Sequence, residues 1–113
     1  HTILENKTLK LMHTNALDDY YFPIEIPSIG IVRDVNYVND LKAYGWGFGC
    51  RTLMDLEKNN NLGSLGEFGW AGAASTYFLI DNNKDMSALL MTQVLSGSPE
   101  LKNDFYKFIY TNF

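Results

Sequence analysis

The chain has little cysteine, few basic residues and no long apolar run, and each absence excludes a class of protein. Cys50 is the only cysteine among 113 residues, so neither an internal disulfide nor a multi-cysteine zinc site can form. Nine Lys and Arg residues stand against 13 Asp and Glu residues, and the net charge of -4 argues against a nucleic-acid partner. No apolar run approaches the roughly 20 residues that a membrane helix needs. We therefore expect no nucleic acid, no membrane segment in this chain, no metal and no cofactor.

Apolar residues are present in an ordinary amount for a folded domain, and aromatic residues are abundant. Their shares are 46% and 14% of the sequence. Aromatic side chains of this size need burial, and 113 residues suffice for one core. The composition therefore predicts a single domain with a packed interior.

The first half of the chain reads as a short helix, a long loop and a strand. Residues 5–16 place Leu9, Met12 and Ala16 at helical spacing, which predicts a short amphipathic helix. Pro23 and Pro27 interrupt an aromatic stretch, so residues 18–38 are expected to form a loop with extended pieces. Glycine then alternates with aromatic residues from residue 44, and this period of two predicts a strand over residues 44–54.

The second half reads as a hairpin followed by a helix. Residues 68–81 and 86–95 are rich in apolar and β-branched residues and are separated by turn chemistry at residues 81–85. Ser98 and Pro99 then begin a helix over residues 98–113, with an apolar stripe at Leu101, Phe105, Ile109 and Phe113. We predict an α+β fold: a three-stranded antiparallel meander, near residues 44–54, 68–81 and 86–95, with this helix on one face. Apolar residues on both faces of the hairpin predict that both faces are covered.

Several residues suggest sites that we do not assign. His13 has no readable partner for general-base chemistry, and Cys50 is expected to be a small strand residue. The aspartate pairs at residues 18 and 19 and at residues 81 and 85 lack the spacing of an EF-hand and suit turns.

Three stretches, taken in order, carry a resemblance to a known family. Residues 4–17 (LENKTLKLMHTNAL) are similar to a helix with the pattern L-S-P-x-T-x-x-x-M-x-x-N-x-L, and residues 44–51 (YGWGFGCR) to a strand Y-G-x-G-F-G-x-x. Residues 68–81 (FGWAGAASTYFLID), followed by Met91-Thr92-Gln93, are similar to x-G-W-G-G-A-A-G-T-x-F-W-I-D and M-T-Q. The chain thus resembles the C-terminal part of the serine β-lactamase and penicillin-binding-protein superfamily, especially class C β-lactamase-like esterases.

The resemblance implies that residues 1–113 are the C-terminal part of the α/β domain of a larger hydrolase. Family chemistry uses a Ser-x-x-Lys nucleophile, a Tyr-x-Asn or Tyr-x-Ser motif and a third motif on a strand. None of the serines, at residues 28, 64, 75, 87, 96 and 98, is followed three residues later by lysine. Tyr37-Val-Asn39 and Tyr110-Thr-Asn112 spell the second motif but lie at unsuitable places in the chain. We therefore expect the nucleophile and the helical domain to lie outside this chain.

The third motif corresponds to Trp70, Ala71 and Gly72. By family position these residues line the substrate cleft on an edge strand, and the backbone N–H of Ala73 points to the developing oxyanion. Ala71 replaces the usual Gly or Thr and so removes a hydroxyl contact to substrate, which places a true β-lactamase in doubt. The alternative is that residues 69–74 are small only because strands pack closely there.

The expected function is therefore a share in a serine hydrolase acting on an ester, amide or β-lactam bond through an acyl-serine intermediate, and the isolated chain is expected to be inactive. A non-catalytic binding or assembly module of the same fold is the alternative. A peptidoglycan-processing penicillin-binding protein is disfavoured by Trp70 in place of lysine. The expected partners are the small-molecule substrate, the missing N-terminal part and, through the free edge of residues 86–95, a second copy.

Overall fold

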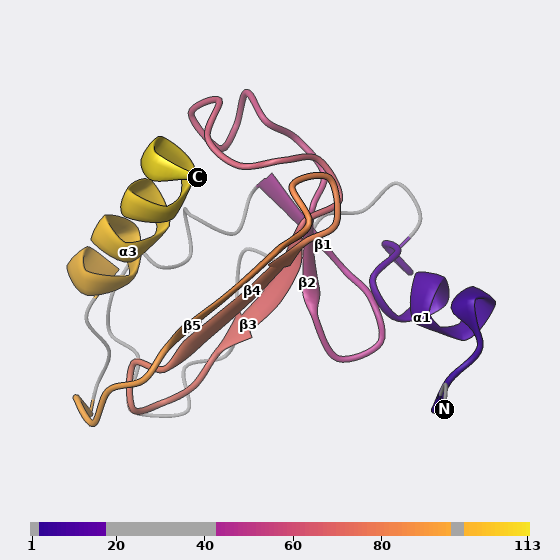
Figure 1. Cartoon of the computed structure of the whole chain (residues 1–113), viewed down its shortest axis with the longest axis horizontal. Helices are drawn as coiled ribbons and strands as arrows, with labels where there is room; N and C mark the ends of the chain where they lie inside the picture. Colours follow the sequence, from indigo (N-terminus) through magenta and orange to yellow (C-terminus); the bar gives the residue numbers. More distant parts are fainter. Residues whose placement is uncertain (1–2, 18–42, 96–98) are drawn as a thin grey trace.

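The computed structural model describes residues 3–17, 43–95 and 99–113, and the predicted loop at residues 18–38 lies outside this part. Within these ranges two helices and five strands follow one another (Figure 1). They are α1 (Asn6–Met12), β1 (Tyr44–Trp46), β2 (Arg51–Leu53), β3 (Phe68–Ala71), β4 (Tyr77–Asp81), β5 (Met86–Leu90) and α3 (Pro99–Asn112). Neither helix is long and apolar enough to cross a membrane, within the part of the chain described.

The sheet is an antiparallel meander with five strands in the order β1-β2-β3-β4-β5, so the prediction of three strands is wrong. The predicted strand at residues 44–54 is a hairpin, because Gly49 has a positive φ of 99° and the Gly47 N–H donates to the Cys50 carbonyl. The predicted strand at residues 68–81 divides into β3 and β4 around a turn where Ser75 has a φ of 60°. The hairpin of β4 and β5 is confirmed, although β5 ends at Leu90.

The C-terminal helix is confirmed, and it covers one face of the sheet (Figure 1). It begins at Pro99, whose missing N–H costs nothing in the first helical turn. Its Tyr106 and Ile109 form a buried cluster with Tyr77 and Leu79 of β4, the inward residues of that strand. A smaller cluster joins Ala43, Tyr44 and Leu53 at the β1 end of the sheet.

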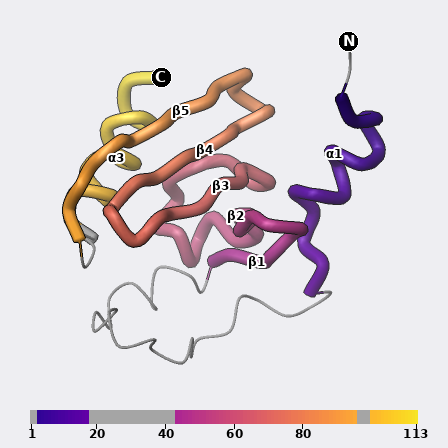
Figure 2. Tube along the Cα trace, turned by 90° about the horizontal axis from the view of Figure 1, so that it is seen from below, coloured from indigo at the N-terminus to yellow at the C-terminus, as the bar shows by residue number. Residues whose placement is uncertain are grey.

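The N-terminal helix, α1, is shorter than predicted and has no buried residue. The chain after it is held against the β1–β2 hairpin, since the Phe48 N–H donates to the Met12 carbonyl at 2.9 Å and the Thr52 hydroxyl donates to the His13 carbonyl at 2.9 Å. Figures 1 and 2 place α1 and α3 at opposite ends of the sheet; in Figure 2 they lie at right and left.

The face of the sheet away from α3 is only partly covered within residues 3–17, 43–95 and 99–113. The ring of His13 stacks on that of Phe68, with centroids 4.6 Å apart, and the rings of Trp46 and Trp70 meet edge to face at 4.5 Å. Leu89 of β5 remains 65% exposed on this face. The prediction that both faces are covered therefore holds for the α3 face but not for the opposite face at Leu89.

Candidate functional site

The four residues of the predicted third motif are placed by the end of β3 and the turn that follows it. Trp70 and Ala71 are the last two residues of β3 and are half-buried. Gly72 and Ala73 begin the turn to β4 and are exposed. The structure thus leads from a packed strand to an open backbone at the position where the resemblance expects the oxyanion donor.

The turn has a defined internal geometry. The Gly72 N–H donates to the Thr76 carbonyl at 2.9 Å, and the Ser75 N–H donates to the Gly72 carbonyl at 3.0 Å. A Cβ at position 72 would meet the Thr76 hydroxyl, so a larger residue here would require the Thr76 side chain to move. These contacts close the turn around Ala73 and Ala74.

The turn is also tied to the segment after β5. The Ala74 carbonyl accepts hydrogen bonds from the Thr92 hydroxyl and from the Val94 N–H, the latter at 3.2 Å. The Ser75 hydroxyl donates to the Val94 carbonyl at 2.8 Å. The N–H of Ala73, between these anchored residues, makes no hydrogen bond to any other described residue. A fixed turn therefore presents backbone donors that include the N–H of Ala73, which is more exposed than Ala74 and Thr76.

The expected edge position of β3 is wrong for the strand as a whole. The sheet order places β3 between β2 and β4. Its register with β2, however, comprises only Gly69 opposite Arg51 and Phe68 opposite Thr52, whereas the register with β4 continues to Ala71 opposite Tyr77. The third motif thus begins where the pairing with β2 has ended.

The other residues considered from the sequence do not form a site. Burial raises the pKa of the Cys50 thiol, which disfavours the reactive thiolate. Asp81 is buried, and its Oδ1 accepts N–H groups of the β4–β5 turn. No group of three potential metal ligands occurs within the described ranges, which exclude Asp18 and Asp19. Tyr37 and Asn39 also lie outside those ranges, and the Asn112 amide donates to the Phe108 carbonyl within α3.

A buried polar cluster beneath α3 was not predicted from the sequence. Glu67, which is 1% exposed, lies just before β3 and meets three tyrosine hydroxyls. Its Oε1 accepts from Tyr44 at 3.0 Å and from Tyr106 at 2.8 Å, and its Oε2 lies 2.8 Å from the hydroxyl of Tyr110. The same Tyr110 hydroxyl lies 2.9 Å from Oδ2 of Asp81. The cluster therefore joins β1, the residue before β3, β4 and α3 through the carboxyl groups of Glu67 and Asp81.

Burial controls protonation in this cluster. It raises the pKa of Glu67, against the attraction of Arg51 and the hydrogen bonds from the tyrosines. It also raises the pKa values of Tyr106 and Tyr110, with further contributions from neighbouring groups that include Glu67. The tyrosines accordingly remain hydrogen-bond donors, and Glu67 retains a proton more readily than an exposed carboxyl does.

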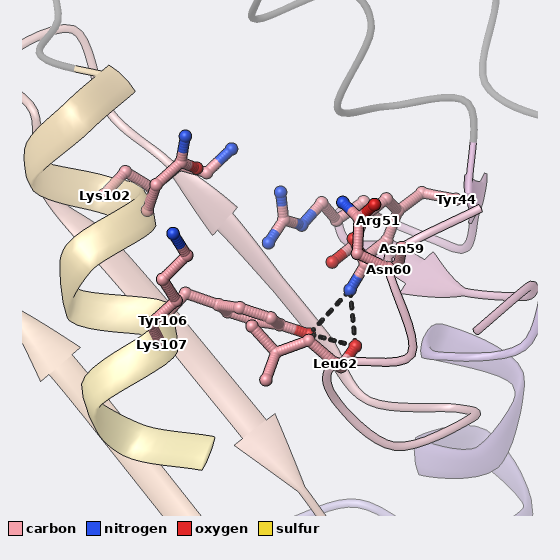
Figure 3. Close-up of a pocket in the computed structure, with 9 residues that line it drawn as sticks. Tyr44, Arg51, Asn59, Asn60, Leu62, Lys102, Tyr106 and Lys107 are labelled. Carbon is pink, nitrogen blue, oxygen red and sulfur yellow. Dashed lines mark hydrogen bonds between the residues drawn. The ribbon is translucent and has the colours of Figure 1, made fainter. Parts of the chain in front are cut away.

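Arg51 extends the cluster toward a cavity of about 410 Å³ between β2, the loop after it and α3 (Figure 3). Its guanidinium carbon lies 4.2 Å from the ring centroid of Tyr44 and 4.8 Å from that of Tyr77, so the charge is held between two aromatic rings. The lining residues are Tyr44, Arg51, Asn59, Asn60, Leu62, Lys102, Asn103, Tyr106 and Lys107.

One sequence signal could have indicated this region. Tyr106 and Tyr110 are four residues apart and therefore share a face of the predicted helix. Polar hydroxyls on a face that is to be buried need buried partners, but the sequence does not show that Glu67 and Arg51 lie beside them.

No protein-family model matches the chain, and no curated protein matches it either.

Proposed function

We propose that this chain supplies the third-motif strand and the oxyanion-hole wall of a β-lactamase-like serine hydrolase. The parent protein would cleave an ester, amide or β-lactam bond through an acyl-serine intermediate. Its nucleophile would lie outside these 113 residues, because no serine here has a lysine three residues after it. Support comes from the motif resemblance and from the local structure at residues 70–73.

The observation that carries the proposal is the exposed N–H of Ala73 in a turn anchored on both sides. Acyl transfer develops negative charge on the carbonyl oxygen, and a donor that is already fixed in place stabilises this charge without reorganising. Gly72 lacks a side chain beside the donor, so a substrate can approach the backbone closely. Trp70 and Ala71 would form the adjoining wall.

The residue types favour an ester substrate within this class. Ala71 offers no hydroxyl to a substrate carboxylate, and Trp70 offers no charge where penicillin-binding proteins carry lysine. An uncharged wall suits an apolar ester better than an anionic β-lactam or a peptidoglycan stem peptide.

Two measurements test the proposal. The coding sequence upstream of residue 1 should encode a Ser-x-x-Lys helix, and a parent protein with that serine should hydrolyse a chromogenic ester. The isolated chain should take no covalent label from a fluorophosphonate probe. Labelling of Ser64 or Ser75 in the isolated chain, or an upstream sequence without any Ser-x-x-Lys, would contradict the assignment.

A non-catalytic assembly module is the second candidate, and the β5 edge favours it. β5 is the last strand of the sheet, and Leu89, Met91 and Leu95, in β5 and the residues after it, are largely exposed. Such an edge can pair with another chain. A native translation start close to Thr2, with no catalytic serine upstream, would support the module and exclude the enzyme.

A further inference from the structure

We propose that the cavity between β2 and α3 binds the phosphate group of a small organic ligand, with Arg51 as its central contact. The cavity is separate from the third motif, because none of the residues 70–73 lines it. The proposal therefore does not depend on the serine-hydrolase assignment.

The first argument is the state of Arg51. Its side chain is 2% exposed, yet its Nη2 has no hydrogen-bond partner within the described part of the chain. A buried charged donor without an acceptor is costly, and such groups normally have a partner. In Figure 3 the guanidinium group points into the cavity, toward α3. An anionic oxygen in the cavity would supply the acceptor that the described residues do not.

The second argument is the charge of the lining. Lys102 and Lys107 of α3 join Arg51, so three of the nine basic residues of an acidic chain line one cavity. No Asp or Glu is among the lining residues. Asn59, Asn60 and Asn103 add amide groups that can donate hydrogen bonds to further oxygen atoms.

Glu67 does not neutralise this charge fully. Its oxygens are engaged by tyrosine hydroxyls, and it does not line the cavity. Burial raises the pKa of Glu67, so its negative charge is less readily present beside Arg51 than that of an exposed carboxylate. The charged side chains that line the cavity are therefore all basic.

The third argument selects phosphate among anions. A guanidinium group presents parallel N–H donors that match two oxygens of a phosphate or a carboxylate. Three positive groups are better balanced by a phosphate monoester, with a charge of about -1.5 to -2 at neutral pH, than by a single carboxylate. The volume of about 410 Å³ lies within the usual range for small-molecule sites and leaves room for an organic part.

The lining is also held in shape. The Asn59 amide donates to the Leu62 carbonyl at 2.6 Å and to the Tyr106 hydroxyl at 3.1 Å, which ties the loop to α3 (Figure 3). Tyr106 in turn donates to Glu67. Because these contacts fix both sides of the cavity, little ordering should be needed on binding.

The test is a titration of the 113-residue chain with inorganic phosphate and with glycerol phosphate, monitored by calorimetry and by the backbone amide signals of residues 101–107. Sodium chloride at equal ionic strength and sodium acetate are the comparison titrations. We expect saturable binding of both phosphates, tighter for the monoester, and no saturation with chloride. Acetate binding as tight as phosphate binding would overturn the choice of phosphate, and no saturable phosphate binding would overturn the site.

Variants connect the binding to the cavity. Lys102→Gln and Lys107→Gln should each weaken phosphate binding by up to about fivefold, as for partly exposed charge pairs, and Arg51→Lys by about tenfold or more, because the planar fork is lost. Lys10→Gln on α1 removes the same charge far from the cavity and should change binding less than about twofold. Equal losses in the Lys10 and Lys107 variants would show nonspecific attraction and overturn the proposal. Should Arg51→Lys fail to fold, the lysine variants decide.

Discussion

The hydroxyl oxygen of Tyr110 lies 2.8 Å from Oε2 of Glu67, one of two carboxyl groups that this hydroxyl contacts. The same hydroxyl lies 2.9 Å from Oδ2 of Asp81, yet it has only one proton to donate. Both contacts can be hydrogen bonds only if a carboxyl group is protonated. Burial raises the pKa of Glu67, which favours Glu67 as the holder of this proton. Protonated Glu67 then donates to Tyr110, which donates to Asp81.

This arrangement predicts a stability that falls as pH rises. The pKa of Glu67 is above its ordinary value of 4.5 in the folded chain, so the folded state binds the proton more tightly than the unfolded state. The stabilisation is fully present below 4.5 and is lost as pH rises through the folded-state pKa. Denaturant unfolding at a series of pH values above 4.5 should show a decreasing free energy of unfolding.

Glu67→Gln should remove this slope. The amide oxygen can accept from Tyr44 and Tyr106, and the amide nitrogen can donate to Tyr110, so every contact is satisfied without a titrating proton. Glu67→Ala should instead lower the free energy of unfolding by roughly 2–4 kcal/mol, because the Tyr44 and Tyr106 hydroxyls lose their acceptor and the Tyr110 hydroxyl loses a donor. A Glu67→Gln variant with the wild-type slope would mean that another group holds the proton.

The buried tyrosines predict cooperative unfolding at alkaline pH. Burial raises the pKa values of Tyr44, Tyr106 and Tyr110, so their ionisation favours the unfolded state. The stability that they contribute is present below the ordinary tyrosine value near 10 and is lost as pH rises above it. Ultraviolet absorbance should show tyrosinate from these residues only when circular dichroism reports unfolding. Ionisation of all seven tyrosines in the folded chain would contradict their burial.

Close packing of β3 against β4 gives a prediction about Gly69. A Cβ at this position would collide with the Phe78 carbonyl oxygen, a backbone atom that cannot rotate away. Gly69→Ala should therefore lower the free energy of unfolding by about 1–3 kcal/mol, measured by denaturant unfolding. Ser87→Ala, at an exposed position of β5 in the same sheet, should change it by less than about 0.5 kcal/mol. Equal effects of the two substitutions would show that β3 and β4 are not so closely packed.

The sequence predicted the element types better than the strand boundaries. Alternation of glycine with aromatic residues is typical of a strand, but glycine also permits the positive φ of a turn. Gly49 has such a φ, and the turn at this residue divides the predicted strand into β1 and β2. Ser75 also has a positive φ, and a turn of this kind could not be predicted from the sequence because Ser75 is not a glycine. Strand number was therefore underestimated at two tight turns.

The apolar stripe predicted for the C-terminal helix was correct near its middle and wrong at its end. Residues four apart advance by about 40° more than a full turn in an α-helix, so a stripe at residues 101, 105, 109 and 113 rotates away from the sheet. Ile109 is buried, but Phe113 is 74% exposed. Tyr106 is buried as well. The polar cluster that contains it was not predicted, because its members lie far apart in the sequence.

The exposed edge of β5 predicts self-association of the isolated chain. Leu89 is directly opposite Phe78 in the register and stays exposed, beside the outer side of β5, which pairs with no other described strand. Light scattering should show a mass that rises with concentration, and Leu89→Lys should reduce it by adding charge at the edge. Leu65→Lys, an exposed leucine outside the strands, is the matched control. A stable monomer at high concentration would count against association through β5.

The most specific prediction concerns Ala73 in the parent protein. Proline at this position deletes the N–H, and loss of one oxyanion donor costs about 3 kcal/mol, or on the order of a hundredfold or more in kcat. Ala73→Gly keeps the N–H and should retain most of the activity on the same ester. KM should change less than kcat, because an oxyanion donor acts mainly in the transition state.

A purely structural role would produce a different pattern. Proline in the turn could disturb the anchors at Gly72 and Ser75, in which case Tm would fall together with activity. Equal Tm values for the wild-type, Ala73→Gly and Ala73→Pro proteins must therefore accompany the kinetic comparison. If a well-folded Ala73→Pro protein keeps the wild-type kcat, the N–H is no oxyanion donor. The small residue at position 72 would then reflect its closeness to the Thr76 hydroxyl, and no catalytic reason.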